Sequence, residues 1–215
     1  MIFQATHIFK VLALVILFQF CTVKPLFSQE KNYRIGFYYG EADQANFLFN
    51  NTDYLYETRM VKLTVNRPFK QLGKFRFEFD VGLAYYAATQ QLLNLFFVTP
   101  DEDNFMELRE LFTQERSSNE YALHLGLIIR YTIKDALSVY FLGSVGPMYT
   151  DIETERLARG FAFSDIASLG IVYDWGKWGI DLRLTARHNS NAGLQLPNSG
   201  VNSLGWETGV FARLF

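Results

Sequence analysis

A histidine and a serine two residues apart, His188 and Ser190, are the residues of this chain whose types and spacing best fit catalysis. They stand at the end of a predicted strand, in the segment 187–193, RHNSNAG. In a β-strand, residues i and i+2 face the same side, with Cα atoms about 6.6 Å apart. The imidazole can then reach the hydroxyl and act as its general base. The pair indicates an esterase, provided that a further group holds the imidazole in place.

The first 29 residues are predicted to be a signal peptide, separate from the fold. Lys10 precedes an apolar core from Val11 to about Val23, and a short segment at 24–29 follows it. This core is too short to span a bilayer and is typical of a secretory signal. Cys21, the only cysteine, lies inside it, so the mature chain is predicted to lack a thiol. The remainder, 30–215, suits one domain.

Composition points to an outer membrane. The chain has 21 Phe and 12 Tyr, yet after the predicted signal no apolar run approaches the ~20 residues of a membrane helix. Export, high aromatic content and the absence of such a run favour a transmembrane β-barrel. The net charge of −2 gives no reason to expect nucleic acid as a partner.

Alternation with period two predicts the strands. In 74–86 the odd positions are apolar and the even ones carry four charges, and 121–131 and 178–187 repeat the pattern. Weaker versions occur near 33–41, 56–66, 136–148, 161–174 and 203–215. Short turns near 67–73, 133–136 and 175–177 alternate with longer segments near 42–55, 87–119, 149–160 and 189–203, of which 87–119 is expected to hold a short helix. The prediction is an all-β, eight-stranded antiparallel transmembrane barrel with its long loops outside.

The cost of charge in lipid decides which face is inside. Arg or Lys on the lipid side costs roughly 2–4 kcal/mol at the bilayer midplane. The charged face is therefore expected to form a packed ionic interior, comprising Lys74, Arg76, Glu78 and Asp80 together with Asp181, Arg183, Glu207 and Arg213. By the same alternation His188 and Ser190 face outward at the external rim, level with the head groups and ester linkages of the outer leaflet.

The segment 188–193, HNSNAG, followed by 197–200, PNSG, resembles the signature of the PagL-type lipid A 3-O-deacylases, and Phe161 to Gly170 is a weaker echo of that family. The resemblance implies an outer-membrane carboxylic ester hydrolase of a Gram-negative bacterium that removes an ester-linked acyl chain from the lipid A of lipopolysaccharide. It implies Ser190 as nucleophile, His188 as general base, and Asn191 with the Gly193 backbone as oxyanion donors. It implies neither metal nor cofactor.

The chain departs from the family at Asn202, where the deacylases carry a glutamate. Replacing the acid of a serine protease triad by its amide lowers turnover by roughly 10⁴, or about 5.5 kcal/mol. Asn202 could orient His188 but would supply no charge. We therefore expect either a slow deacylase or a related barrel whose activity has lapsed.

Two alternatives from other classes are considered. The first is a catalytically inert structural barrel of the small OmpA or OmpX type, and Asn202 is the best support for it. The second is a secreted lipocalin-like binder, which would need the apolar faces to point inward and is disfavoured by the motif and the terminal Phe215. The sequence leaves open whether the barrels pair as homodimers.

Overall fold

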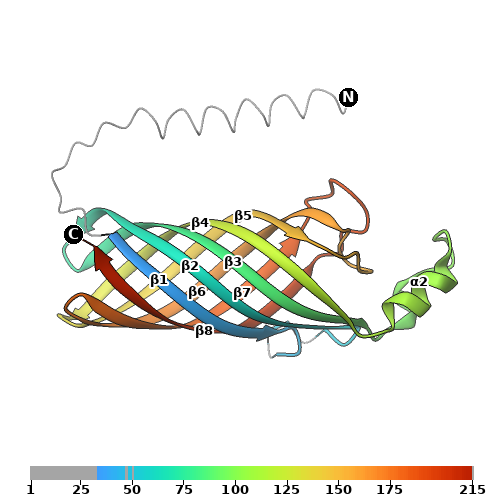
Figure 1. Cartoon of the computed structure of the whole chain (residues 1–215), viewed down its shortest axis with the longest axis horizontal. Coiled ribbons are helices and arrows are strands. Elements are labelled where there is room, and N and C mark those ends of the chain that lie inside the picture. Colours follow the sequence, from blue (N-terminus) through green and yellow to red (C-terminus); the bar gives the residue numbers. More distant parts are fainter. Residues whose placement is uncertain (1–32, 47, 50, 215) are drawn as a thin grey trace, which may run out of the picture. The chain divides into compact units, whose positions relative to one another are not determined.

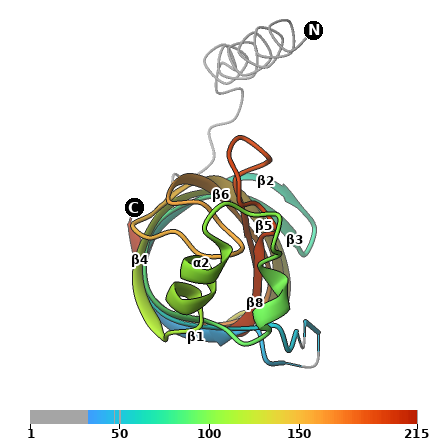
Figure 2. The same cartoon turned by 90° about the vertical axis from the view of Figure 1, so that its right-hand side faces the viewer.

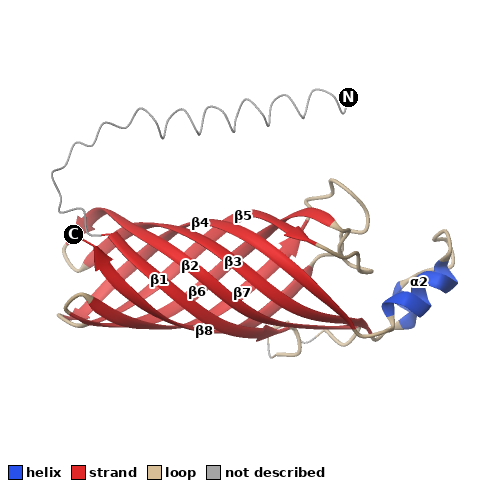
Figure 3. Ribbon diagram, in the orientation of Figure 1, coloured by secondary structure: helices blue, strands red, loops and turns tan. Residues whose placement is uncertain are grey.

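The structure, a computed structural model, describes residues 33–46, 48–49 and 51–214. The strands form a closed antiparallel barrel in chain order, with the last strand returning to the first (Figures 1 and 3). Their bounds are β1 (Tyr33–Asp43), β2 (Tyr54–Leu72), β3 (Phe75–Leu92), β4 (Arg116–Lys134), β5 (Leu137–Thr150), β6 (Gly160–Trp175), β7 (Trp178–Ser190) and β8 (Val201–Leu214). The predicted eight-stranded antiparallel barrel is confirmed. The predicted signal peptide at 1–29, with Cys21, and the terminal Phe215 lie outside the described residues.

The turn predicted near 67–73, from Pro68 and Gly73, is present but shorter than expected. Strand β2 continues through Pro68 to Leu72, and the chain reverses at Gly73, whose φ is +58°. The pairing of β2 with β3 shifts register between Pro68 and Lys70. Such irregularities accept a residue that has no backbone N–H to donate. The hairpin therefore extends further than its proline suggests.

The longest loop, 93–115, contains the short helix that was expected there. It holds a 3-10 turn, η1 (Leu95–Phe97), and helix α2 (Phe105–Phe112). It extends beyond one end of the barrel and lies in front of the opening in the end-on view (Figures 1 and 2). Leu92, Val98 and Phe112 form its buried cluster. None of the helices in the described part of the chain is long and apolar enough to cross a membrane.

The barrel interior is filled by paired charges and aromatic side chains. The contacts are Glu78 with Arg76 and Arg130, Glu207 with Lys62 and Arg183, Glu120 with Arg187, Asp174 with Arg34 and Arg213, Asp80 with Asn66, and Asp181 with Tyr38 and Tyr140. The predicted ionic interior is confirmed, with one correction. Lys74 lies in the exposed turn after Gly73, where its ammonium is 5.9 Å from the centre of the Tyr131 ring. It is outside the ionic interior because β3 begins only at Phe75.

Candidate active site

The barrel wall directs the predicted nucleophile and base away from the lumen. Along β7 the odd residues, such as Arg183 and Arg187, are buried, and the even residues Leu182 and Leu184 are exposed. His188 and Ser190 continue the even, outer face and are half-buried. The predicted outward orientation of both side chains is therefore confirmed, and it follows from the period-two geometry of the strand.

Asn202 holds the imidazole of His188. The two residues are directly opposed in the pairing of β7 with β8, and His188 Nδ1 lies 2.7 Å from Asn202 Oδ1. The Asn202 backbone N–H donates in turn to the Tyr54 hydroxyl at 3.3 Å. With a carbonyl oxygen as its partner, Nδ1 carries the proton, which leaves the lone pair of Nε2 available as a base. The amide thus orients the ring and fixes its tautomer, but it supplies no negative charge.

A glycine packs directly against that ring. Gly200 has φ of +73°, a conformation that side chains disfavour. A Cβ atom added to Gly200 would lie 2.9 Å from Cε1 of His188 and 3.1 Å from the Asn189 carbonyl oxygen. The backbone therefore occupies the space beside the imidazole, and any side chain there would displace the ring or the loop.

The loop 191–200 is built around the side chain of Asn191, which is almost completely buried. Its Nδ2 donates to the Gln195 carbonyl at 2.7 Å and to the Pro197 carbonyl at 3.3 Å, and its Oδ1 accepts from Gly193 N–H at 3.1 Å. The Asn191 backbone N–H donates to Asn198 Oδ1 at 2.7 Å. These bonds close the loop immediately after the serine and so fix the direction in which the chain leaves β7.

The segment before β6 braces this loop from the other side. Ala158 N–H donates to the Pro197 carbonyl at 3.0 Å, and Gly200 N–H donates to the Arg156 carbonyl at 3.1 Å. Arg156 Nε donates back to the Gly200 carbonyl at 3.0 Å, and its guanidinium lies 4.3 Å from the centre of the Tyr54 ring. Two loops far apart in sequence therefore share the support of the His188 ring.

The two groups expected to donate to an oxyanion are engaged inside the loop. Both Asn191 Nδ2 and Gly193 N–H have partners there, as described above. Donation from Asn191 to a substrate would require these loop bonds to rearrange, because the side chain is almost completely buried. The oxyanion role of Asn191 and Gly193 stays a prediction.

Ser190 and His188 lie side by side without a hydrogen bond between them, within the described part of the chain. Contacts between nucleophile and base are often long before substrate binds and tighten in the complex. The structure therefore brings together Ser190, His188 and Asn202 on one outer face. The hydrogen bond from Ser190 to His188 that proton transfer requires is not formed.

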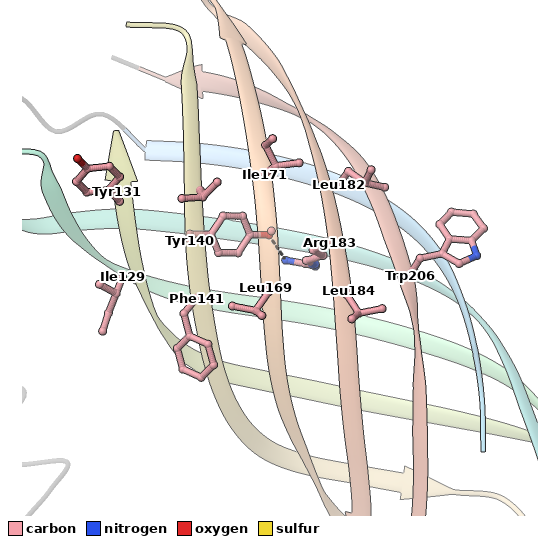
Figure 4. A pocket seen from close by; sticks show the side chains of 12 residues that line it. Ile129, Tyr131, Tyr140, Phe141, Leu169, Ile171, Leu182, Arg183, Leu184 and Trp206 are labelled. Atoms are coloured by element: carbon pink, nitrogen blue, oxygen red, sulfur yellow. Dashed lines mark hydrogen bonds between the residues drawn. The ribbon is translucent and has the colours of Figure 1, made fainter. Parts of the chain in front are cut away.

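Apolar surface continues from this site down the outer wall. The opposed pairs of β6 and β7 run from Ala167 with Ala186 to Leu169 with Leu184. The leucines line a shallow groove on the outside of the barrel, shown in Figure 4, which also includes Ile129, Phe141, Ile171, Leu182 and Trp206. The small side chains of Ala167 and Ala186 lie on the outer face between these leucines and His188.

Two leucines mark the loop on the other side of the site. Leu194 and Leu196 are 70% and 85% exposed, and the segment between β7 and β8 projects away from the barrel wall in the end-on view (Figure 2). Strongly exposed leucines beside a lipid-facing wall favour contact with a membrane surface. The candidate site is thus bordered by apolar groups above and below.

Sequence reasoning missed one charged neighbour of the base. Asp165, on β6, is directly opposed to His188 and is exposed on the outer face. The sequence contains a sign of this neighbour: Asp165 interrupts an otherwise apolar alternation that includes Phe161, Phe163 and Leu169. Glu207, the carboxylate nearest to Asn202 in the sequence, is buried inside the barrel as expected.

Comparisons with known proteins identify the family of the chain. Residues 75–210 match the family described as lipid A 3-O-deacylase (PagL), which is more than half of the chain. The chain belongs to the lipid A 3-O-deacylase family. No curated protein sequence matches the chain significantly.

One solved structure supports the fold, and a second is less similar. The crystal structure of the outer membrane enzyme PagL has a TM-score of 0.53 and 15% identity, covering 82% of this chain and 97% of that one. Neisserial surface protein A has a TM-score of 0.49 and 11% identity, covering 85% and 97%. The family match and the barrel fold together make the protein a lipid A deacylase-like β-barrel of the Gram-negative outer membrane.

Proposed function

We propose that this deacylase-family barrel hydrolyses an ester-linked acyl chain of lipid A in the outer leaflet, with Ser190 as nucleophile, His188 as general base and Asn202 as the residue that orients the base. The observation that carries the proposal is the 2.7 Å contact between His188 Nδ1 and Asn202 Oδ1 on the outer face, beside Ser190. A polar trio of this kind has no structural use against lipid, whereas it has the parts of a serine esterase.

The reaction follows from those groups. Ser190 Oγ bonds to the ester carbonyl carbon while its proton moves to His188 Nε2, and the carbonyl oxygen becomes the oxyanion. As the intermediate collapses, the bond to the sugar oxygen breaks and the imidazolium gives its proton to that oxygen. Water, deprotonated by His188, then attacks the acyl-serine, and the fatty acid leaves as Ser190 recovers its proton.

The surroundings of the site support a lipid substrate. The groove of Leu169 and Leu184 suits one acyl chain of a lipid that stays in the leaflet. Burying a chain on apolar wall yields about 0.8 kcal/mol per methylene relative to water. Because the chain starts in lipid, however, the groove mainly orients the ester and adds little affinity. Positioning of the ester at Ser190 is the larger gain.

The test is the mass of lipid A from cells that express the protein. Wild-type protein should remove an ester-linked acyl chain, and Ser190→Ala should leave lipid A intact. The matched control is Ser199→Ala, which makes the same change on an exposed loop residue of the same segment. Identical lipid A spectra from wild type and Ser190→Ala would reject the enzymatic proposal in favour of an inert barrel.

A further inference from the structure

Asp165 breaks the apolar outer face of β6. Its neighbours on that face are Phe161, Phe163, Ala167 and Leu169, and Asp165 itself is exposed. An ionisable side chain directed at lipid is costly, so it identifies a candidate functional site by default. We therefore looked for a partner of this carboxylate in the structure.

The register places that carboxylate beside the catalytic base. Asp165 and His188 are directly opposed across β6 and β7, which sets their Cβ atoms about 4.5–5.5 Å apart. His188 thus has one direct neighbour on each side, Asn202 on β8 and Asp165 on β6. Within the described part of the chain, Asp165 makes no ion pair or hydrogen bond through its side chain.

Glu41, another carboxylate on the outer face, has side-chain partners that Asp165 lacks. Glu41 on β1 accepts a hydrogen bond from the Tyr39 hydroxyl at 2.5 Å and lies 3.7 Å from Arg59. Its charge is therefore compensated by neighbours. The Asp165 carboxylate has no such partner, so its charge is available to His188.

We propose that Asp165 supplies the negative charge that Asn202 cannot give, and that the acid of this site has moved from one neighbouring strand of His188 to the other. The proposal rests on the proposed esterase function. When the Ser190 proton passes to Nε2 of His188, a positive imidazolium forms between the Asn202 amide and the Asp165 carboxylate. Asp165 stays ionised and takes no proton. It acts on His188 and does not touch the substrate, so it is a positioning residue.

A positive charge near the His188 ring is a second reason for a carboxylate at this place. Arg156 reaches the site from the loop before β6, and its Nε donates to the Gly200 carbonyl beside the imidazole. On β8 the outward neighbours, Asn202 and Trp206, are not ionisable. A nearby cation disfavours the protonated ring, and an anion within about 4–6 Å favours it. Asp165 offsets the cation.

The experiment compares Asp165→Asn with the matched control Glu41→Gln in the full barrel, purified in micelles. One readout is deacylation kinetics on lipid A. The other is the rate at which a small fluorophosphonate labels Ser190, which requires no turnover of lipid A. We expect Asp165→Asn to lower kcat about 10-fold with little change in KM, and to lower the labelling rate of Ser190 about 10-fold. Glu41→Gln should change neither, and Asp165→Glu should retain most of both.

The two readouts separate this proposal from the proposed function. A wild-type barrel that leaves lipid A intact, but whose Ser190 is labelled more slowly in Asp165→Asn, would reject the function and support the charge assignment. An unchanged labelling rate in Asp165→Asn would overturn the assignment whatever the activity on lipid A. A rise in KM alone would also overturn it, because it would mean that Asp165 contacts the substrate.

Discussion

Restoring an acid at position 202 is the sharpest perturbation that the structure offers. Asn202→Asp keeps the size and shape of the side chain and changes its charge, so the 2.7 Å contact with His188 Nδ1 can be kept. The family carries a glutamate here, and Asn202→Glu tests whether the longer side chain also reaches the ring across the same strand pair. Both variants should raise the rate of deacylation, because each adds a charge opposite the imidazolium.

The size of the gain follows from the geometry. Two unit charges about 4 Å apart interact by about 4 kcal/mol at an effective dielectric constant of about 20. Because His188 and Asn202 are half-buried at the rim, water and salt reduce this value. We expect a gain of about 2–4 kcal/mol in the transition state, which corresponds to about 30- to 1,000-fold in kcat. The gain should be larger in an Asp165→Asn background, where no other carboxylate faces the ring.

The assay is the initial rate of fatty acid release from lipid A, measured by mass spectrometry on folded barrel in micelles. The matched control is Asn198→Asp, which adds the same charge four residues earlier, in the loop before β8, while its side chain still accepts from Asn191 N–H. If Asn202→Asp and Asn202→Glu fold and yet leave kcat unchanged or lower, the charge argument is refuted. If Asn198→Asp gives the same gain, the effect is a general one of loop charge.

Two further predictions concern the support of the site and of the barrel. Gly200→Ala should lower kcat at least 10-fold, because its Cβ would press on the His188 ring and the residue would be held at positive φ, at a cost of roughly 1–2 kcal/mol; normal activity in the folded variant would contradict the packing argument. Glu207→Gln should destabilise the barrel by about 3–5 kcal/mol, since it leaves Lys62 and Arg183 buried without their anion; thermal unfolding in detergent measures this, and an unchanged midpoint would show that the pair is dispensable.

The sequence by itself determined the strands, their inner and outer faces and the outward direction of His188 and Ser190. These features depend on a period of two residues, which is local and is set by the cost of charge in lipid. The resemblance to the deacylases also implies that Asn202 stands where an acid is expected, and this stays a prediction. The turn near 67–73 was predicted too long, because a proline at a register shift within a strand resembles a turn residue in the sequence.

Only the tertiary structure decided which residues flank His188. The register of β6 against β7 places Asp165 beside the ring, and that of β7 against β8 places Asn202 there. Register depends on turn lengths and on the closure of the whole barrel, which no single strand encodes. The hydrogen bonds of Asn191 inside its loop could not be predicted from the sequence either. They join its side chain to backbone groups whose positions depend on the conformation of the loop.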